Sequence, residues 1–205
     1  MIELNNISVS FDDKKVIDKL SFKFLDGINY AIMGESGCGK TTLMNVIAGT
    51  VKGFEGFVNT NGARISYVFQ DPRLYDWLTV SENVSIVSSL PLVHAKKRAE
   101  YILETLGLED ATELHPSELS GGMRQRVSIA RAIAYDPDVM LIDEPFRALD
   151  EETRVKVAKY LFDFMKEKTV IMVTHDVNDT FYADQILTVA TTPLRELAMA
   201  KSVNP

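Results

Sequence analysis

Two glycine-containing segments of this sequence could each place a helix N-terminus against a phosphate group. The first covers residues 34–42 and reads Gly-Glu-Ser-Gly-Cys-Gly-Lys-Thr-Thr; the second covers residues 119–126 and reads Leu-Ser-Gly-Gly-Met-Arg-Gln-Arg. The first turn of a helix offers unpaired N–H donors and a partial positive charge, so both segments can bind an anion. The second segment has neither a lysine nor carboxylates of its own, so the two segments require different explanations.

The first segment has the spacing of a P-loop, in which backbone N–H groups surround the α- and β-phosphates of a nucleotide. Lys40 is expected to reach the β- and γ-phosphates, and the Thr41 hydroxyl is expected to bind Mg²⁺. A strand predicted at residues 28–33 precedes the loop, and a helix predicted from Thr42 to Ala48 follows it, as a P-loop requires. The loop residues expected to bind ATP are Gly34, Glu35, Ser36, Gly37, Cys38, Gly39, Lys40, Thr41 and Thr42.

Two adjacent carboxylates follow an apolar stretch that predicts a buried strand at residues 139–143. Asp143, at the end of the strand, is expected to hold Mg²⁺ through its water shell. Glu144 lies one residue later and points elsewhere, so it can accept a proton from the attacking water. The pair therefore predicts two separate roles beside the P-loop.

Two further polar side chains follow predicted strands. His175 comes after a strand predicted at residues 170–174, and Gln70 comes after one at residues 65–69. The carboxyl ends of parallel strands meet at the ligand crevice, so we expect both side chains near the γ-phosphate. Gln70 can ligate Mg²⁺ or position water, but its amide cannot act as a general base near neutral pH.

The remaining pattern predicts an α/β fold around these groups. Peripheral antiparallel strands are expected within residues 2–11 and 20–24, and a further core strand at 186–189. Between residues 70 and 137 the apolar spacing becomes helical, which predicts a helical lobe inserted into the α/β core. A short helix is predicted at residues 194–200. We expect a single domain, 1–205, with a mostly parallel core at about 1–70 and 137–205 and a helical subdomain at about 71–136.

Composition narrows the compartment and the partners. A net charge of -7 argues against nucleic-acid binding, because phosphate backbones recruit surfaces rich in Lys and Arg. No apolar stretch approaches the roughly 20 residues needed to cross a bilayer, and residues 1–5 lack the pattern of a signal peptide. The single cysteine, Cys38, excludes an internal disulfide. We therefore expect a cytoplasmic protein.

Together these segments resemble the ATP-binding subunits of ABC transporters, along nearly the whole chain. In that family the P-loop is the Walker A motif, Gln70 is the Q-loop residue, and residues 119–122 are the signature. Residues 139–144 resemble Walker B, residues 148–150 the D-loop, and His175 the switch histidine. The resemblance implies a Mg²⁺-dependent ATPase whose catalytic residues are Glu144, His175, Gln70 and Lys40, with Mg²⁺ held by Thr41, Gln70 and Asp143.

Three positions bear on how closely the chain follows the family. Phe11 stands where the family has an adenine-stacking aromatic, and the alternative is a core residue of an edge strand. Met123 stands where many members carry glutamine, and Arg147 where many carry serine. Neither of these two departures removes a group expected to perform chemistry, but Arg147 could alter contacts across a subunit boundary.

The second glycine segment is best explained by a partner chain. Ser120 is expected to cap a helix beginning at Gly121, but a capped helix alone does not explain two glycines, which each cost roughly 1 kcal/mol relative to alanine. A second complete nucleotide site would need a lysine and carboxylates. The resemblance implies a head-to-tail, ATP-dependent homodimer, in which Ser120, Gly121 and Gly122 contact a γ-phosphate held by the other chain.

The region after Gln70 is similar to the importer branch for nitrate, sulfonates and taurine, in residues 69–74, 77–80 and 82–84. Tyr75 and Trp77 could line a groove, near Gln70 to Trp77, that receives a coupling helix of a membrane permease, or could be core residues. The resemblance implies a peripheral protein on the inner face of the cell membrane, serving permease subunits and, indirectly, a solute-binding protein. The alternatives are an exporter ATPase subunit and an ABC ATPase that acts on nucleic acid or ribosomes.

Overall fold

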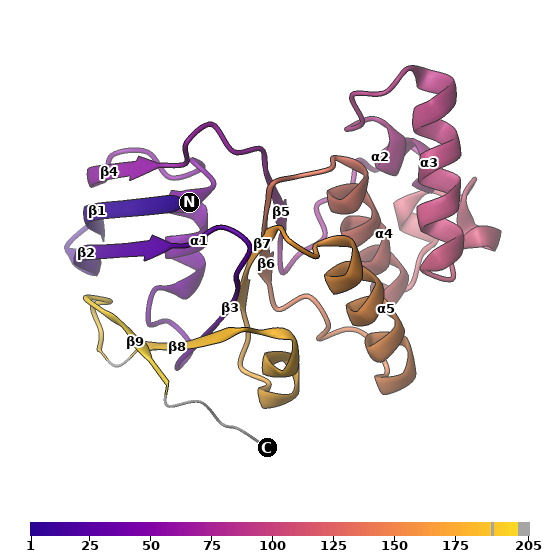
Figure 1. The fold of residues 1–205 in the computed structure, drawn as a ribbon. Coiled ribbons are helices and arrows are strands. Elements are labelled where there is room, and N and C mark those ends of the chain that lie inside the picture. Colours follow the sequence, from indigo (N-terminus) through magenta and orange to yellow (C-terminus); the bar gives the residue numbers. More distant parts are fainter. Residues whose placement is uncertain (190, 201–205) are drawn as a thin grey trace. The chain divides into compact units, whose positions relative to one another are not determined.

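The computed structural model describes residues 1–189 and 191–200 (Figure 1). These residues form two compact units. The first, which we call the sheet unit, comprises Met1–Ile65, Asp138–Asp143 and the described residues from Glu167 onward. The second, the helical unit, comprises Ser66–Pro137 and Glu144–Lys166.

Five strands of the sheet unit lie in one sheet in the order β6-β7-β3-β8-β9: β3 (Asn29–Met33), β6 (Val139–Asp143), β7 (Thr169–Val173), β8 (Gln185–Val189) and β9 (Leu197–Met199). β6, β7, β3 and β8 are parallel, and β9 is antiparallel to β8. All residues of β6 and β7 are buried, as is typical of parallel strands covered on both faces. The carboxyl ends of β3, β6 and β7 therefore lie at one edge.

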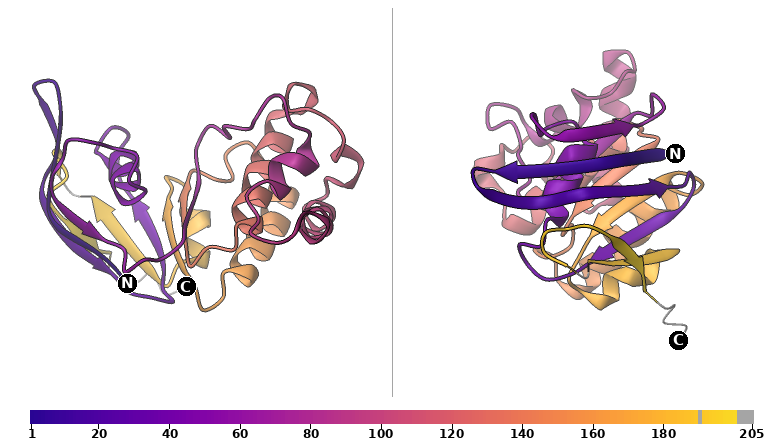
Figure 2. Two further views of the ribbon diagram at one scale, coloured as in Figure 1. Left: turned by 90° about the horizontal axis from the view of Figure 1, so that it is seen from above. Right: turned by 90° about the vertical axis from the view of Figure 1, so that its left-hand side faces the viewer.

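A three-stranded antiparallel sheet completes the sheet unit, in the order β2-β1-β4: β1 (Ile2–Phe11), β2 (Lys14–Phe24) and β4 (Glu55–Asn59). Helix α1 (Lys40–Ile47) lies between this sheet and the parallel strands, and contacts both β2 and β6 (Figure 2). The predicted antiparallel strands β1 and β2 are confirmed, whereas β4 has no counterpart in the sequence prediction.

The helical unit is built from helices α2 (Val80–Ser85), α3 (Leu92–Thr105), α4 (Gly121–Ala134) and α5 (Glu151–Phe164), with β5 (Ile65–Val68) leading into it. Helices α2, α3 and α4 contact one another, and α4 also contacts α5. The helical character predicted between residues 70 and 137 is confirmed, whereas α5 was not predicted. None of the helices in residues 1–189 and 191–200 is long and apolar enough to cross a membrane. The helical unit also contains the short 3₁₀ helices η1 (Glu109–Ala111) and η2 (Pro116–Glu118), and the sheet unit contains η3 (Val177–Tyr182).

The helix predicted at residues 194–200 is wrong. Residues Leu197–Met199 form β9, which pairs with β8 through Val189 opposite Leu197 and Leu187 opposite Met199. Leu, Ala and Met favour helix locally, but so short a helix has too few internal hydrogen bonds to offset its nucleation. Pairing with the edge of an existing sheet is the more favourable arrangement.

Candidate active site

The P-loop connects β3 to α1 and closes around the Lys40 ammonium group. Lys40 Nζ donates hydrogen bonds to the carbonyl oxygens of Gly34, at 2.8 Å, and Glu35, at 2.7 Å, and the residue is only 9% exposed. Gly39 caps α1 with a φ of 105°, a left-handed conformation that favours glycine, and a side chain there would also meet Val16. A positive charge is thus held at the centre of a loop whose shape depends on glycine.

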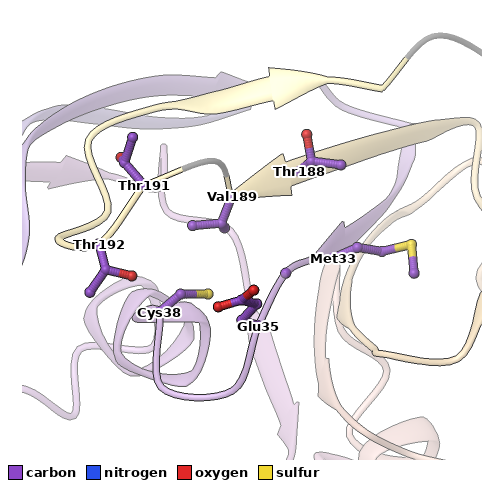
Figure 3. A pocket seen from close by; sticks show the side chains of 8 residues that line it. Met33, Glu35, Cys38, Thr188, Val189, Thr191 and Thr192 are labelled. Atoms are coloured by element: carbon purple, nitrogen blue, oxygen red, sulfur yellow. The ribbon is translucent and has the colours of Figure 1, made fainter.

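A pocket of about 450 Å³ adjoins the P-loop on the side of β8 (Figure 3). Glu35 and Cys38 extend toward it from the loop, while Thr188 and Val189 line it from β8. The complete set of described residues that line the pocket is Met33, Gly34, Glu35, Cys38, Thr188, Val189, Thr191 and Thr192. Three of the residues predicted to bind ATP therefore border one open space.

A hydrogen bond joins the first turn of α1 to the end of β6. Thr41 Oγ1 donates to Asp143 Oδ2 at 2.7 Å, although the two residues are 102 positions apart in the sequence. Asp143 is 2% exposed. The structure therefore brings together a hydroxyl oxygen and a carboxylate at the start of α1, directly after the P-loop.

His175 follows β7 at the same edge of the sheet. Val173, the last residue of β7, lies opposite Asp143 of β6 and Ile32 of β3, so the three strands end together. Thr174 shapes the turn that follows, because its hydroxyl accepts a hydrogen bond from Asp176 N at 3.0 Å. His175 itself is exposed.

Phe11 lies at the end of β1 and is paired with Lys14 of β2. It is 51% exposed, which excludes the alternative of a core residue. An exposed aromatic ring is available to stack on a planar group such as adenine.

In the helical unit, two donors converge on one oxygen of Glu144. Gln70 Nε2 donates to Glu144 Oε2 at 3.2 Å, and Arg147 Nη1 donates to the same oxygen at 3.4 Å. Glu144 itself has a φ of 47°, a left-handed conformation that few residues other than glycine adopt. The sequence predicted Gln70 near the γ-phosphate and Glu144 as the acceptor of a proton from the attacking water, and the structure joins the two by a hydrogen bond. It gave Arg147 no role inside one chain, although its spacing of three residues from Glu144 was an available signal.

The signature segment caps α4 and packs against the segment after Glu144. Ser120 Oγ accepts a hydrogen bond from Met123 N at 3.2 Å, so the predicted cap is confirmed. A side chain at Gly122 would come within 2.9 Å of the carbonyl oxygen of Ala148, whereas one at Gly121 would meet nothing within 4 Å. The two signature glycines therefore have different surroundings: Gly122 allows a close backbone approach and Gly121 is open.

Asp150 ends this segment and caps α5. Its Oδ1 accepts a hydrogen bond from Thr153 N at 2.9 Å. That backbone hydrogen bond, together with a side-chain hydrogen bond from Thr153 and the charge of Arg126, lowers the pKa of Asp150 from its ordinary value. Asp150 therefore remains an anion at the N-terminus of α5, where the helix dipole favours negative charge.

Tyr75 and Trp77 form a tilted aromatic pair on the helical unit, with ring centroids 5.3 Å apart. Trp77 is 73% exposed, so the alternative of a core residue is wrong for it. Arg131 supports the preceding segment by donating to the carbonyl oxygens of Pro72 and Arg73, and its guanidinium lies 5.7 Å from the Tyr75 ring centre. The segment between Gln70 and Trp77 thus presents aromatic surface that is anchored from α4.

The structure groups the predicted residues within each unit. The sheet unit brings together the P-loop, Thr41 and Asp143, with His175 at the same sheet edge, and the helical unit brings together Gln70 and Glu144 and, separately, the signature glycines and Ala148. The P-loop lies between a parallel strand and a helix, and a buried carboxylate at the end of β6 is hydrogen-bonded to the first turn of that helix. This arrangement defines a P-loop nucleoside triphosphatase.

The comparisons with known proteins narrow this class. A family model described as ABC transporter matches residues 17–147, and the chain belongs to this family. The chain is 38% identical to the aliphatic sulfonates import ATP-binding protein SsuB of a strain of Bacillus cereus, over 88% of the chain and 77% of the relative. It is also 38% identical to the taurine import ATP-binding protein TauB of Roseobacter denitrificans, over 92% of the chain and 76% of the relative.

Solved structures agree with this assignment. A dimeric structure of the ATP-binding cassette MJ0796, a bacterial ABC transporter cassette, matches with a TM-score of 0.86 at 31% identity, over 92% of this chain and 94% of that one. A dimeric post-hydrolysis state of the same cassette bound to ADP and Pi matches with a TM-score of 0.83 at 30% identity, over the same shares. The chain is an ABC ATPase: it binds ATP and hydrolyses it, as the ATP-binding subunit of an ABC transporter.

The two signature glycines provide a matched test of the packing around Ala148. Gly121→Ala is expected to leave the free energy of unfolding unchanged or to raise it by up to ~1 kcal/mol, because alanine favours helix and the site is open. Gly122→Ala is expected to lower it by ~1–3 kcal/mol, because the methyl group would overlap the Ala148 carbonyl. Urea unfolding of both variants measures the difference, and equal stabilities would contradict the close approach.

Proposed function

We propose that this chain powers a solute importer, closing and reopening a head-to-tail homodimer as it binds and hydrolyses ATP. One observation supports the proposed dimer. Within the described residues, α1 and α4 each begin at a glycine segment suited to an anion. Of these two helices only α1 has a lysine and a metal-side carboxylate beside it, while α4 begins at an open Gly121. A partner's nucleotide is the ligand that α4 lacks within its own chain.

Mg²⁺ fits the oxygen pair at the start of α1. The Thr41 hydroxyl and the Asp143 carboxylate are 2.7 Å apart, and hydroxyl and carboxylate oxygens are the ligands that Mg²⁺ prefers. When bound there, Mg²⁺ would offset the negative charge of the phosphates. Thr41 would bind it directly and Asp143 through its water shell. Gln70 is the further proposed ligand, from the helical unit.

The other site residues have separate proposed tasks. The P-loop residues Gly34–Thr42 hold the phosphates through backbone N–H groups and the Lys40 ammonium, and Phe11 stacks on adenine. Glu144 accepts the proton of the attacking water, Gln70 positions that water, and His175 contacts the γ-phosphate. What supports these tasks is the exposure of Phe11 and His175 and the contact between Gln70 and Glu144.

In the dimer, Ser120, Gly121 and Gly122 would contact the γ-phosphate bound by the partner chain. ATP then stabilises the closed dimer and ADP does not, because only ATP supplies the group that both chains bind. The solved cassettes that this chain matches are described as dimers, which supports the proposal.

The proposed partners are permease subunits at the inner face of the cell membrane and, through them, a solute-binding protein. The exposed Tyr75–Trp77 pair is a suitable contact for an amphipathic helix of a permease, and nucleic acid is an unsuitable partner for a chain of net charge -7. The relatives named for aliphatic sulfonates and taurine favour import and a sulfonated solute.

The proposed subdomain limits are about 1–70 and 137–205 for the core and about 71–136 for the helical part. Helices α2, α3 and α4 fall within the helical part.

The base assignment is tested with Glu144→Gln. This variant is expected to bind ATP as wild type does but to lower kcat for hydrolysis by roughly 100- to 10,000-fold, the usual contribution of a general base. It should also accumulate as an ATP-bound dimer, because closure no longer leads to hydrolysis. Nucleotide titration, phosphate release and size-exclusion chromatography with ATP measure the three properties; near-normal turnover would remove Glu144 from the mechanism.

The composite site is tested by mixing two inactive chains. Lys40→Ala damages the P-loop and Ser120→Arg damages the signature, so each homodimer has two damaged sites. A mixed dimer has one site in which the intact P-loop faces the intact signature. ATPase activity is therefore expected to be highest at intermediate mixing ratios and lost at both extremes. If heterodimers form but activity does not recover, each site lies within a single chain.

The membrane partner is tested by copurification from the native cell membrane. The wild-type chain is expected to retain permease subunits, and Trp77→Ala is expected to retain fewer at the same ATPase activity, because it removes exposed aromatic surface outside the catalytic groups. Identification of the retained subunits by mass spectrometry, and uptake of taurine or an alkanesulfonate with and without the chain, measure the outcome. Retention of an exporter permease, or of ribosomes, would replace the import proposal.

A further inference from the structure

A cluster of exposed apolar side chains lies where α2 leads into α3 (Figure 1). Of the fifteen large hydrophobic residues that are exposed in the described part of the chain, four fall within residues 86–93: Ile86, Leu90, Leu92 and Val93. We call these four residues the apolar cluster. Leu92 and Val93 are 68% and 65% exposed. Single exposed apolar side chains are ordinary, whereas a group of them marks an interaction surface.

An ordered turn holds the apolar cluster outside the core. Ser88 Oγ accepts a hydrogen bond from Leu90 N at 3.2 Å, and the Pro91 carbonyl oxygen accepts one from Ala95 N at 2.9 Å. The opposite side of α3 packs into the helical unit through a separate set of buried residues: Ala95, Ala99, Ile102 and Leu103. The apolar cluster could therefore turn inward only if α3 unpacked.

Positive charge borders the apolar cluster. Lys96 and Lys97 are exposed on α3, and within the described part of the chain neither forms an ion pair, whereas Arg98 pairs with Asp136 at 3.8 Å. Residues 83–99 contain no aspartate or glutamate, in a chain whose net charge is -7. Helix α3 has no acidic residue in its first turn and no side-chain cap, so its dipole adds to the positive potential.

An anionic membrane surface is complementary to both features. Lysines near such a surface are attracted to the lipid phosphates, and aliphatic side chains enter the boundary between headgroups and acyl chains. Protein interfaces are instead depleted in lysine and enriched in aromatic residues and arginine. Tyr75 and Trp77, with Arg131 nearby, have that composition, and the apolar cluster with its two lysines does not. The cluster is therefore better suited to lipid than to a permease.

The acidic remainder of the chain opposes such a contact only weakly. At physiological salt, charges more than about 8 Å from the lipid are largely screened. The first acid that follows the lysines is Glu100, one turn further along α3. The charges at the start of α3 therefore decide whether the lipid attracts or repels this surface.

We propose that the apolar cluster, with Lys96 and Lys97, is a docking site for an anionic lipid bilayer. The two lysines contact headgroup phosphates, and Leu92 and Val93 enter the outer part of the acyl region. The site goes beyond the proposed function, because it holds the helical unit at the membrane even when no permease subunit is bound. It involves none of the residues proposed to bind ATP or to act in its hydrolysis.

Cosedimentation of the full chain with protein-free vesicles tests the docking site. The chain is expected to bind vesicles made of equal parts phosphatidylglycerol and phosphatidylcholine. It should bind vesicles of phosphatidylcholine alone at least about tenfold more weakly, because these have no net surface charge to attract lysine. Added NaCl should weaken binding to the anionic vesicles. Equal binding to both kinds of vesicle, or no binding to the anionic kind, would overturn the proposal.

Substitutions separate the contributions of charge and apolar surface. Lys96→Gln/Lys97→Gln is expected to weaken binding to the anionic vesicles by roughly 10- to 30-fold, because it removes both unpaired cations. Val93→Ser is expected to weaken binding by roughly three- to tenfold, because it removes apolar surface that enters the lipid. Both changes lie on exposed positions, and an unchanged kcat for ATP hydrolysis in solution shows that each variant is folded.

Matched controls make the same changes elsewhere on the helical unit. Lys159→Gln/Lys166→Gln removes two exposed lysines, and Val155→Ser alters an exposed valine of α5. Both controls are expected to bind the anionic vesicles within about twofold of wild type. Losses equal to those of the α3 variants would mean unspecific adsorption, and the docking site would be wrong.

The permease is the other candidate for this surface, and it gives a different result. If wild type does not bind vesicles but Lys96→Gln/Lys97→Gln retains fewer permease subunits in detergent, the apolar cluster contacts protein and the lipid proposal fails. The import proposal fails separately, through the identity of the permease subunits that copurify. Vesicle binding requires neither a permease nor ATP, so each proposal can stand or fall without the other.

Discussion

The hydrogen bond from Thr41 to Asp143 is the contact on which the arrangement of the candidate site depends. It joins the first turn of α1, which follows β3, to the end of β6. β3 and β6 are not neighbours in the sheet, because β7 lies between them. The bond can form only if β3, β7 and β6 are parallel and end at the same level. The buried apolar strands therefore do more than fill a core: their register fixes the separation of two oxygens from distant parts of the chain.

The same framework holds the charged groups of the candidate site in place. The Lys40 ammonium is held by the carbonyl oxygens of Gly34 and Glu35, and the buried Asp143 carboxylate accepts a hydrogen bond from Thr41, directly after Lys40 in the sequence. Phosphate and a divalent cation are complementary to such a pair. In the helical unit, the start of α4 at Gly121 is open, and Glu144 pairs with the exposed Arg147 side chain.

The sequence predicted those parts of the structure that are fixed by local pattern. The strand from Val139 to Asp143 was predicted with the limits that the structure shows, because uninterrupted apolar residues lie between acidic ones. β4 was missed because it is almost wholly exposed and contains Gly56, whose lack of a side chain allows β1 to approach. β9 was mistaken for a helix because its residues are helix formers and only the edge of β8 makes them a strand. The spacing of the P-loop could be predicted from sequence, but the convergence of Gln70 and Arg147 on one oxygen depends on side-chain conformations that no spacing determines.

The left-handed backbone of Glu144 has a consequence for how this position can change. A non-glycine residue in that conformation costs on the order of 1 kcal/mol, and glycine or asparagine would relieve the cost. The substitutions that best suit the backbone are therefore those that remove the carboxylate. In a population of variants selected only for thermal tolerance, this position would drift toward glycine or asparagine, and the proposed general base would be lost while the fold improved. A stabilised version of this protein would have to exempt this one residue from consensus or library-based design.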